Sequence, residues 1–104
     1  MKLRILAEAA EEFYKTPNLR SRRKHRNRSH PQYESAHRIK ARHVCQWVAC
    51  DAGYLRSIVG RFWGMDRTSI YYACQVVDNR IATDPEEKRE LKRFVKIVKE
   101  RLSK

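Results

Sequence analysis

The stretch Gly64-Met65-Asp66-Arg67-Thr68-Ser69-Ile70 decides the fold of this chain. Asp66 is a favoured N-cap residue, because its carboxylate can accept hydrogen bonds from the free N–H groups of a helix start. A helix is therefore predicted from here, with an inner side made of Ile70, Ala73, Cys74, Val77 and Ile81. Upstream, residues 54–62 predict a short helix that buries Leu55, Ile58, Val59 and Phe62. With Trp63-Gly64 as the turn, these two helices have the pattern of a helix-turn-helix.

Three more helices are predicted around this pair. Residues 34–52 form a long one, closed by Gly53. Asp84-Pro85 starts the last, with Glu87 at a capping-box position and an inner stripe of Leu91, Phe94, Val95, Val98 and Leu102. Residues 2–14 form the first, ended by Thr16-Pro17, with an apolar stripe of Leu3, Leu6, Ala10, Phe13 and Tyr14. Only three glycines and three prolines are present, so the predicted fold class is all-α.

The segment between the first two helices is strongly basic. Residues 18–31 contain one apolar residue, Leu19, which cannot form a core, and six cations: Arg20, Arg22, Arg23, Lys24, Arg26 and Arg28. A flexible basic arm is expected there. The predicted organisation is an N-terminal helix over 1–17, the arm over 18–31 and a helix-turn-helix domain over 32–104.

The formal net charge is +12, with a pI near 10.1. A surplus this large in a small chain favours an anionic partner, usually nucleic acid or an acidic membrane. No apolar run approaches the roughly 20 residues that span a bilayer. Glu8, Glu11 and Glu12 interrupt any secretory leader at the start. We therefore expect a cytoplasmic, nucleoid-associated protein whose partner is double-stranded DNA and not a membrane.

The helix that begins after Asp66 suits DNA recognition. In a helix-turn-helix the second helix enters the major groove, and its first residues meet the base edges. Arg67 offers a two-pronged donor to guanine, and Thr68 can touch a thymine methyl group. The expected base-reading residues are Asp66, Arg67, Thr68, Ser69, Tyr71 and Tyr72. Helix capping alone would also select Asp66-Arg67-Thr68-Ser69, with Arg67 as a solvated surface charge.

This stretch resembles the C-terminal DNA-binding domain of the bacterial chromosomal replication initiator DnaA. The signature of that domain is Gly-Arg-Asp-His-Thr-Thr-Val, two variable positions and Ala-Cys. The matching residues here are Gly64-Met65-Asp66-Arg67-Thr68-Ser69-Ile70 and Tyr71-Tyr72-Ala73-Cys74, and the resemblance covers roughly residues 32–102. It implies a helix-turn-helix bundle of the DnaA C-terminal type, with an extra N-terminal helix.

The resemblance also implies which cations contact the DNA backbone. Lys40 lies where the family has a phosphate-contacting arginine, and Arg26 and Arg28 are nearest to the family's minor-groove residues. Together with other cations of the arm and the helices, the expected phosphate and minor-groove residues are Arg22, Arg23, Lys24, Arg26, Arg28, Arg38, Lys40, Arg42 and Arg56.

The chain departs from the family in two ways. Met65, Arg67 and Ser69 replace the signature's first Arg, its His and its second Thr. Arg67 reaches farther than histidine and favours guanine, so an altered or relaxed sequence preference is expected. No GxxxxGK[ST] phosphate loop is present in these 104 residues. A free-standing reader is therefore expected, without ATP or another cofactor, as would suit a phage, a mobile element or a small bacterial regulator.

No residues predict catalysis or metal binding. Cys45, Cys50 and Cys74 include no CxxC pair, and their spacing to His37 and His43 matches no structural zinc pattern. The aspartates are dispersed, whereas a nuclease would need clustered carboxylates. Tyr71 and Tyr72 lack the arginine-histidine pattern of a tyrosine recombinase. No enzyme and no small-molecule substrate are expected.

The predicted function is therefore a sequence-preferring DNA-binding regulator of replication or transcription. Two alternatives stay open from sequence alone. In one, the basic arm dominates and the protein is a weakly specific architectural or RNA-binding protein. In the other, it is an adaptor whose residues 2–14 dock a protein partner or self-associate.

Overall fold

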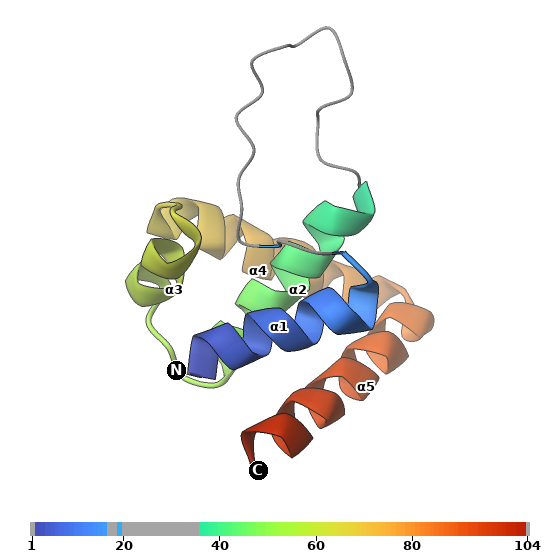
Figure 1. Cartoon of the computed structure of the whole chain (residues 1–104). Helices are drawn as coiled ribbons and strands as arrows, with labels where there is room; N and C mark the ends of the chain where they lie inside the picture. Colours follow the sequence, from blue (N-terminus) through green and yellow to red (C-terminus); the bar gives the residue numbers. More distant parts are fainter. Residues whose placement is uncertain (1, 17–18, 20–35, 104) are drawn as a thin grey trace, which may run out of the picture.

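The computed structural model describes residues 2–16, 19 and 36–103, and this part of the chain is all-α (Figure 1). Its five helices are α1 (Lys2–Tyr14), α2 (Ala36–Asp51), α3 (Arg56–Trp63), α4 (Arg67–Thr83) and α5 (Pro85–Leu102). Each begins and ends within two residues of the span that sequence predicts. The predicted fold class is confirmed.

Helix α1 belongs to the main body of the protein. It packs against α2 and α5, and its stripe of Leu3, Leu6, Ala10 and Tyr14 is buried there. The Phe13 and Tyr14 rings lie 5.4 and 5.8 Å from the ring of Phe94 in α5. The residues of α1 therefore share one core with the helices of residues 36–103.

Leu19 corrects the expectation that residues 18–31 contribute nothing to the core. Its side chain is fully buried among the core residues. Its backbone N–H donates to Oε2 of Glu11 at 2.8 Å, which satisfies a backbone group beside the core. The composition of this segment predicts that its single leucine lies outside the core. Packing against residues distant in the sequence buries it instead. The rest of the predicted arm lies outside the described residues.

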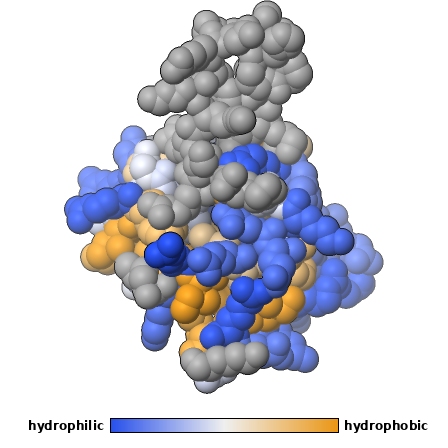
Figure 2. Space-filling model, in the orientation of Figure 1, coloured by the Kyte–Doolittle hydropathy of each residue, from blue (hydrophilic) through white to orange (hydrophobic). Residues whose placement is uncertain are grey.

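The buried face of α3 also differs from the prediction. Val59 and Trp63 are buried and Phe62 is half-buried, but Leu55 and Ile58 are 66% and 43% exposed. Figure 2 shows the resulting apolar surface over α3. Trp63 is the last residue of the helix and not part of the turn. The helix is rotated so that the large indole of Trp63 fills the core.

Both predicted N-caps are present. Oδ1 of Asp66 accepts from the N–H of Ser69, and Oδ1 of Asp84 accepts from the N–H of Glu86, each at 2.9 Å. The expected capping box at Glu87 is not formed. The N–H of Asp84 donates to the carbonyl of Arg80, and Glu87 instead binds Lys40 of α2. A charged partner from another helix has replaced the local hydrogen bond.

No helix among the described residues is long and apolar enough to cross a lipid bilayer. The three cysteines are free thiols; Cys45 is buried, and Cys50 and Cys74 are half-buried. Burial raises the pKa of Cys74 to about 12, and the neighbouring Cys50 adds to the shift. These thiols are packed as small apolar groups, as the sequence predicts.

Candidate nucleic-acid interface

The turn between α3 and α4 is held by backbone hydrogen bonds. Gly64 adopts a left-handed conformation with φ of 69°, and its N–H donates to the carbonyl of Arg61. The next N–H, of Met65, donates to the carbonyl of Gly60 at 2.8 Å. This pair of bonds is a Schellman motif, which closes α3 and turns the chain toward α4.

Gly60 allows this turn to fold back against its helix. A Cβ atom added to Gly60 would lie 2.5 Å from the carbonyl oxygen of Met65, closer than packed atoms approach. A helical residue with a side chain would therefore push the turn away. The missing side chain sets the spacing between the two helices of the motif.

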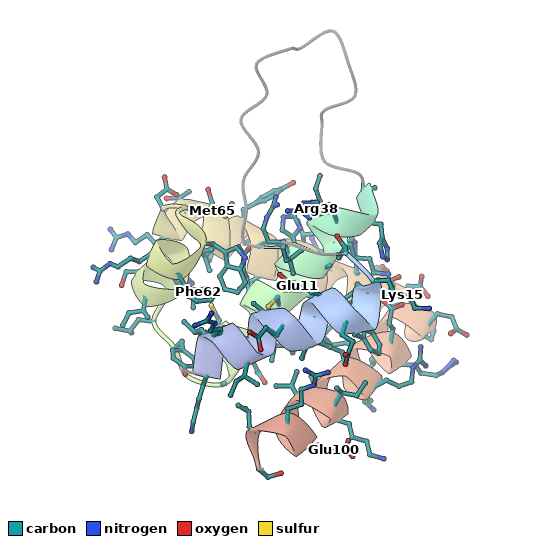
Figure 3. All side chains as sticks on the ribbon, viewed as in Figure 1. Glu11, Lys15, Arg38, Phe62, Met65 and Glu100 are labelled. Carbon is teal, nitrogen blue, oxygen red and sulfur yellow. The ribbon has the colours of Figure 1, made fainter. Side chains whose placement is uncertain are left out.

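Met65 fixes the turn to the core. Its side chain is half-buried, and its Sδ accepts a hydrogen bond from Nε2 of the buried Gln46 at 3.4 Å. Figure 3 shows Met65 where α3 meets α4, and Phe62 in α3. Met65 therefore attaches the turn between α3 and α4 to the buried part of α2.

The start of α4 presents a group of polar side chains to solvent. Asp66, Arg67 and Thr68 are exposed, whereas Ser69 is half-buried and gives its backbone N–H to Asp66. One turn later, Tyr71 and Tyr72 are 48% and 61% exposed. The predicted base-reading residues thus lie together on one end of α4, with Ser69 the least accessible of them.

A cleft separates the first residues of α3 from those of α4. It encloses about 400 Å³ and is lined by Leu55, Arg56, Ser57, Arg67, Thr68 and Tyr71. The guanidinium of Arg56 lies 5.0 Å from the ring centre of Tyr71, a cation–π contact that orients the arginine. Two cations and three hydroxyl-bearing side chains therefore meet at two helix N-termini, where backbone N–H groups also favour anions.

The sequence prediction missed Leu55 and Ser57 as parts of this cleft. The signal was present, because both residues adjoin the start of the first helix of the motif. In known helix-turn-helix proteins the first helix crosses the DNA backbone while the second helix lies in the major groove.

The three cations of α2 that the sequence predicts to contact DNA do not line the cleft; they are Arg38, Lys40 and Arg42. Nζ of Lys40 lies 2.8 Å from carboxylate oxygens of both Glu87 and Glu90 in α5. Arg42 is only 7% exposed, although the sequence predicts it among the phosphate and minor-groove residues. Arg38 is half-buried near the start of α2 (Figure 3), with a guanidinium nitrogen 3.5 Å from Oγ1 of Thr16.

The ion pairs also place Lys40 far from the cleft. Glu87 follows the last residue of α4, whereas Asp66 precedes its first, and the 17 residues of α4 span about 25 Å. We therefore count Arg56 but neither Lys40 nor Arg42 among the cations that surround the cleft. The predicted arm cations Arg22, Arg23, Lys24, Arg26 and Arg28 lie outside the described residues.

The described residues bring no three His, Cys, Asp or Glu side chains together at metal-binding distance. What they bring together is an exposed, capped helix start with an arginine on each side of a cleft. Such an arrangement can bind phosphates and base edges. Neither the models of known protein families nor the curated protein sequences give a match to this chain.

Proposed function

We propose that this protein binds double-stranded DNA in a sequence-preferring manner and regulates replication or transcription in the bacterial cytoplasm, without catalysing a reaction. The observation that supports this most strongly is the helix-turn-helix of α3 and α4, with Arg67 and Thr68 exposed at the capped start of the second helix. These side chains have the chemistry for guanine and thymine edges in the major groove. The resemblance of this stretch to the DnaA signature supports the same assignment.

Two arginines have different roles in this proposal. Arg67, in the first turn of α4, reads a base, whereas Arg56, at the start of α3, holds a backbone phosphate. The contact with Tyr71 keeps Arg56 beside the cleft. The net charge of +12 supplies the salt-dependent affinity that any duplex experiences.

A selection from random duplexes tests the proposal. We expect an enriched motif, and Arg67→Ala or Thr68→Ala should weaken binding to it by about 1–3 kcal/mol, mainly at one base pair each. Arg56→Ala should weaken all duplexes alike and reduce the slope of affinity against salt by about one. Arg93→Ala is the matched control, because Arg93 is an exposed arginine of α5.

Either of two results would contradict the proposal. If no motif is enriched and affinity depends on salt alone, the protein is a non-specific architectural binder. If single strands or RNA compete better than duplexes, the major-groove assignment is wrong. A loss of binding in Arg93→Ala as large as in Arg67→Ala would remove the special role of α4.

A further inference from the structure

A second surface lies away from the cleft, along α5. It is an apolar groove of about 720 Å³ that α5 forms with Trp47 and Asp51 of α2 and Ile81 of α4. The other residues that line it are Ser103, which follows α5, and seven residues of α5: Lys88, Leu91, Lys92, Val95, Lys96, Lys99 and Glu100. Leu91 is buried, and Trp47, Ile81 and Val95 are half-buried, so they form the floor. Glu100, labelled in Figure 3, lies toward the far end of α5. We name this surface the lysine groove.

The rim of the lysine groove is a row of cations. Four exposed lysines at intervals of 4, 4 and 3 residues line it, against two acids, Asp51 and Glu100: Lys88, Lys92, Lys96 and Lys99. On an α-helix this spacing keeps side chains on one face and extends the row over about 16 Å. The charge is therefore drawn out along the apolar floor and not focused at one point.

The groove and the proposed DNA surface can be occupied together. Ile81 lies 14 residues after Arg67 on the same helix, a distance of about 21 Å along its axis. The cleft is lined by residues 55–57, 67, 68 and 71, and none of them lines the groove.

We infer that the lysine groove docks an amphipathic, acidic α-helix of a protein partner, a function that goes beyond the proposed DNA binding. Such a helix repeats its acids every three or four residues, which matches the row of lysines, and its apolar stripe fits the floor. A fatty acid or other small anion carries one negative charge, whereas the rim has four lysines in a row, so it matches the groove less well than an acidic helix. A second copy fits poorly, because its charge is also +12 and the apolar stripe of its helix α1 is already buried.

Titration with a synthetic helix tests the inference on the full chain. The probe is a peptide of about 18 residues, five helical turns, with leucines along one stripe and glutamates beside them. Binding is measured by calorimetry and by the fluorescence of Trp47, which lines the groove, whereas Trp63 is only 2% exposed. Trp47→Phe should abolish the optical signal.

Charge alone would attract any acidic peptide to this protein, so matched controls are essential. Lys92→Glu/Lys96→Glu should weaken binding at least about tenfold, equal to 1.4 kcal/mol. Arg89→Glu/Arg93→Glu makes the same charge change at exposed positions of α5 outside the groove, and should change affinity less than about threefold. A peptide with serines in place of the leucines should bind at least about tenfold more weakly than the probe.

Several outcomes would overturn the inference. One is an equal loss of peptide affinity in both double variants. Another is binding of the serine peptide as tight as that of the probe, and a third is no binding of the probe at concentrations up to about 1 mM. If the protein binds phosphatidylglycerol vesicles more tightly than the probe peptide, the groove is a membrane-binding surface instead. If the protein is a dimer that Lys92→Glu/Lys96→Glu dissociates, the groove binds a second copy of the chain. Arg67→Ala should leave peptide binding unchanged, so a failure of DNA reading and a failure of docking are separately visible.

Discussion

The carboxylate of Asp66 caps α4 and at the same time places a negative charge at the proposed DNA surface. Asn caps a helix about as well as Asp, so Asp66→Asn should change stability by less than about 0.5 kcal/mol. It should raise affinity for every duplex, because a repulsive charge is removed. Asp66→Ala should instead cost about 1 kcal/mol of stability. Thermal unfolding and duplex binding measure the two effects.

A different result for Asp66→Asn would show that Asp66 reads a base. The carboxylate could accept a hydrogen bond from a cytosine amino group. In that case the variant should lose affinity at one base pair of the selected site and gain nothing on scrambled duplexes.

Gly60 offers a second residue-level prediction. Alanine is the better helix former by about 1 kcal/mol, which would stabilise an ordinary helix. The clash of its Cβ with the carbonyl of Met65 should outweigh this gain, and Gly60→Ala should be destabilised by about 1–3 kcal/mol. Ser57→Ala, at an exposed site of the same helix, should be neutral within about 0.5 kcal/mol in urea unfolding. A Gly60→Ala variant more stable than the wild type would contradict the close approach.

At the scale of the elements, Lys40 links α2 to α5. Burial alone would lower the pKa of Lys40, but hydrogen bonds and charge attraction from Glu87 and Glu90 outweigh it and raise the pKa above 10.5. Lys40→Met should therefore destabilise the protein by about 1–2 kcal/mol at neutral pH. Lys92→Met, at an exposed site of α5, should change stability by less than about 0.5 kcal/mol.

The contribution of Lys40 and its two glutamates to the free energy of unfolding should depend on pH in one direction. Because the folded pKa of Lys40 is the higher one, its contribution is complete below pH 10.5 and is lost as the pH rises through the folded value. Burial, with a smaller effect of Glu90, also raises the pKa of Tyr14, so Tyr14 acts in the same direction. The stability difference between wild type and Lys40→Met should shrink above pH 10.5. A difference that stays constant or grows there would contradict the assignment.

Local signals explain how well the helices could be predicted. Asp66, Gly64 and Asp84-Pro85 act within a few residues, so they mark helix ends without knowledge of the rest of the chain. The start of α4 was found in this way, and with it most of the exposed polar group beside the cleft. In α3, eight residues with several apolar side chains do not determine which face is buried.

At the scale of the whole molecule, prediction failed where contacts are distant in sequence. Leu19 is buried because α1 and the other helices surround it, and no local pattern reports this. In the sequence, Lys40 and Arg42 cannot be told apart from exposed surface cations. In the structure, Lys40 pairs with Glu87, 47 residues away, and Arg42 is buried. Charge counts identify a basic protein and not which of its cations are available.

Two leucines test this account of the core. Leu19→Ala should cost about 2–5 kcal/mol, because a fully buried side chain is removed. Leu55→Ala, at a side chain that is 66% exposed, should cost less than about 1 kcal/mol. Composition alone would rank these two leucines in the opposite order. Equal effects in denaturant unfolding would contradict the burial of Leu19.

The packing of α1 has one more consequence. His37 of α2 hydrogen-bonds the carbonyl of Tyr14 in α1, and Arg38 approaches Thr16, so the end of α1 and the start of α2 lie beside each other. The packing of α1 against α2 and α5 should therefore hold the two pieces together after a single protease cut between residues 20 and 35. The nicked protein should migrate as one particle under native conditions and as two fragments in denaturant. The two halves, expressed separately, should reassemble as a split protein.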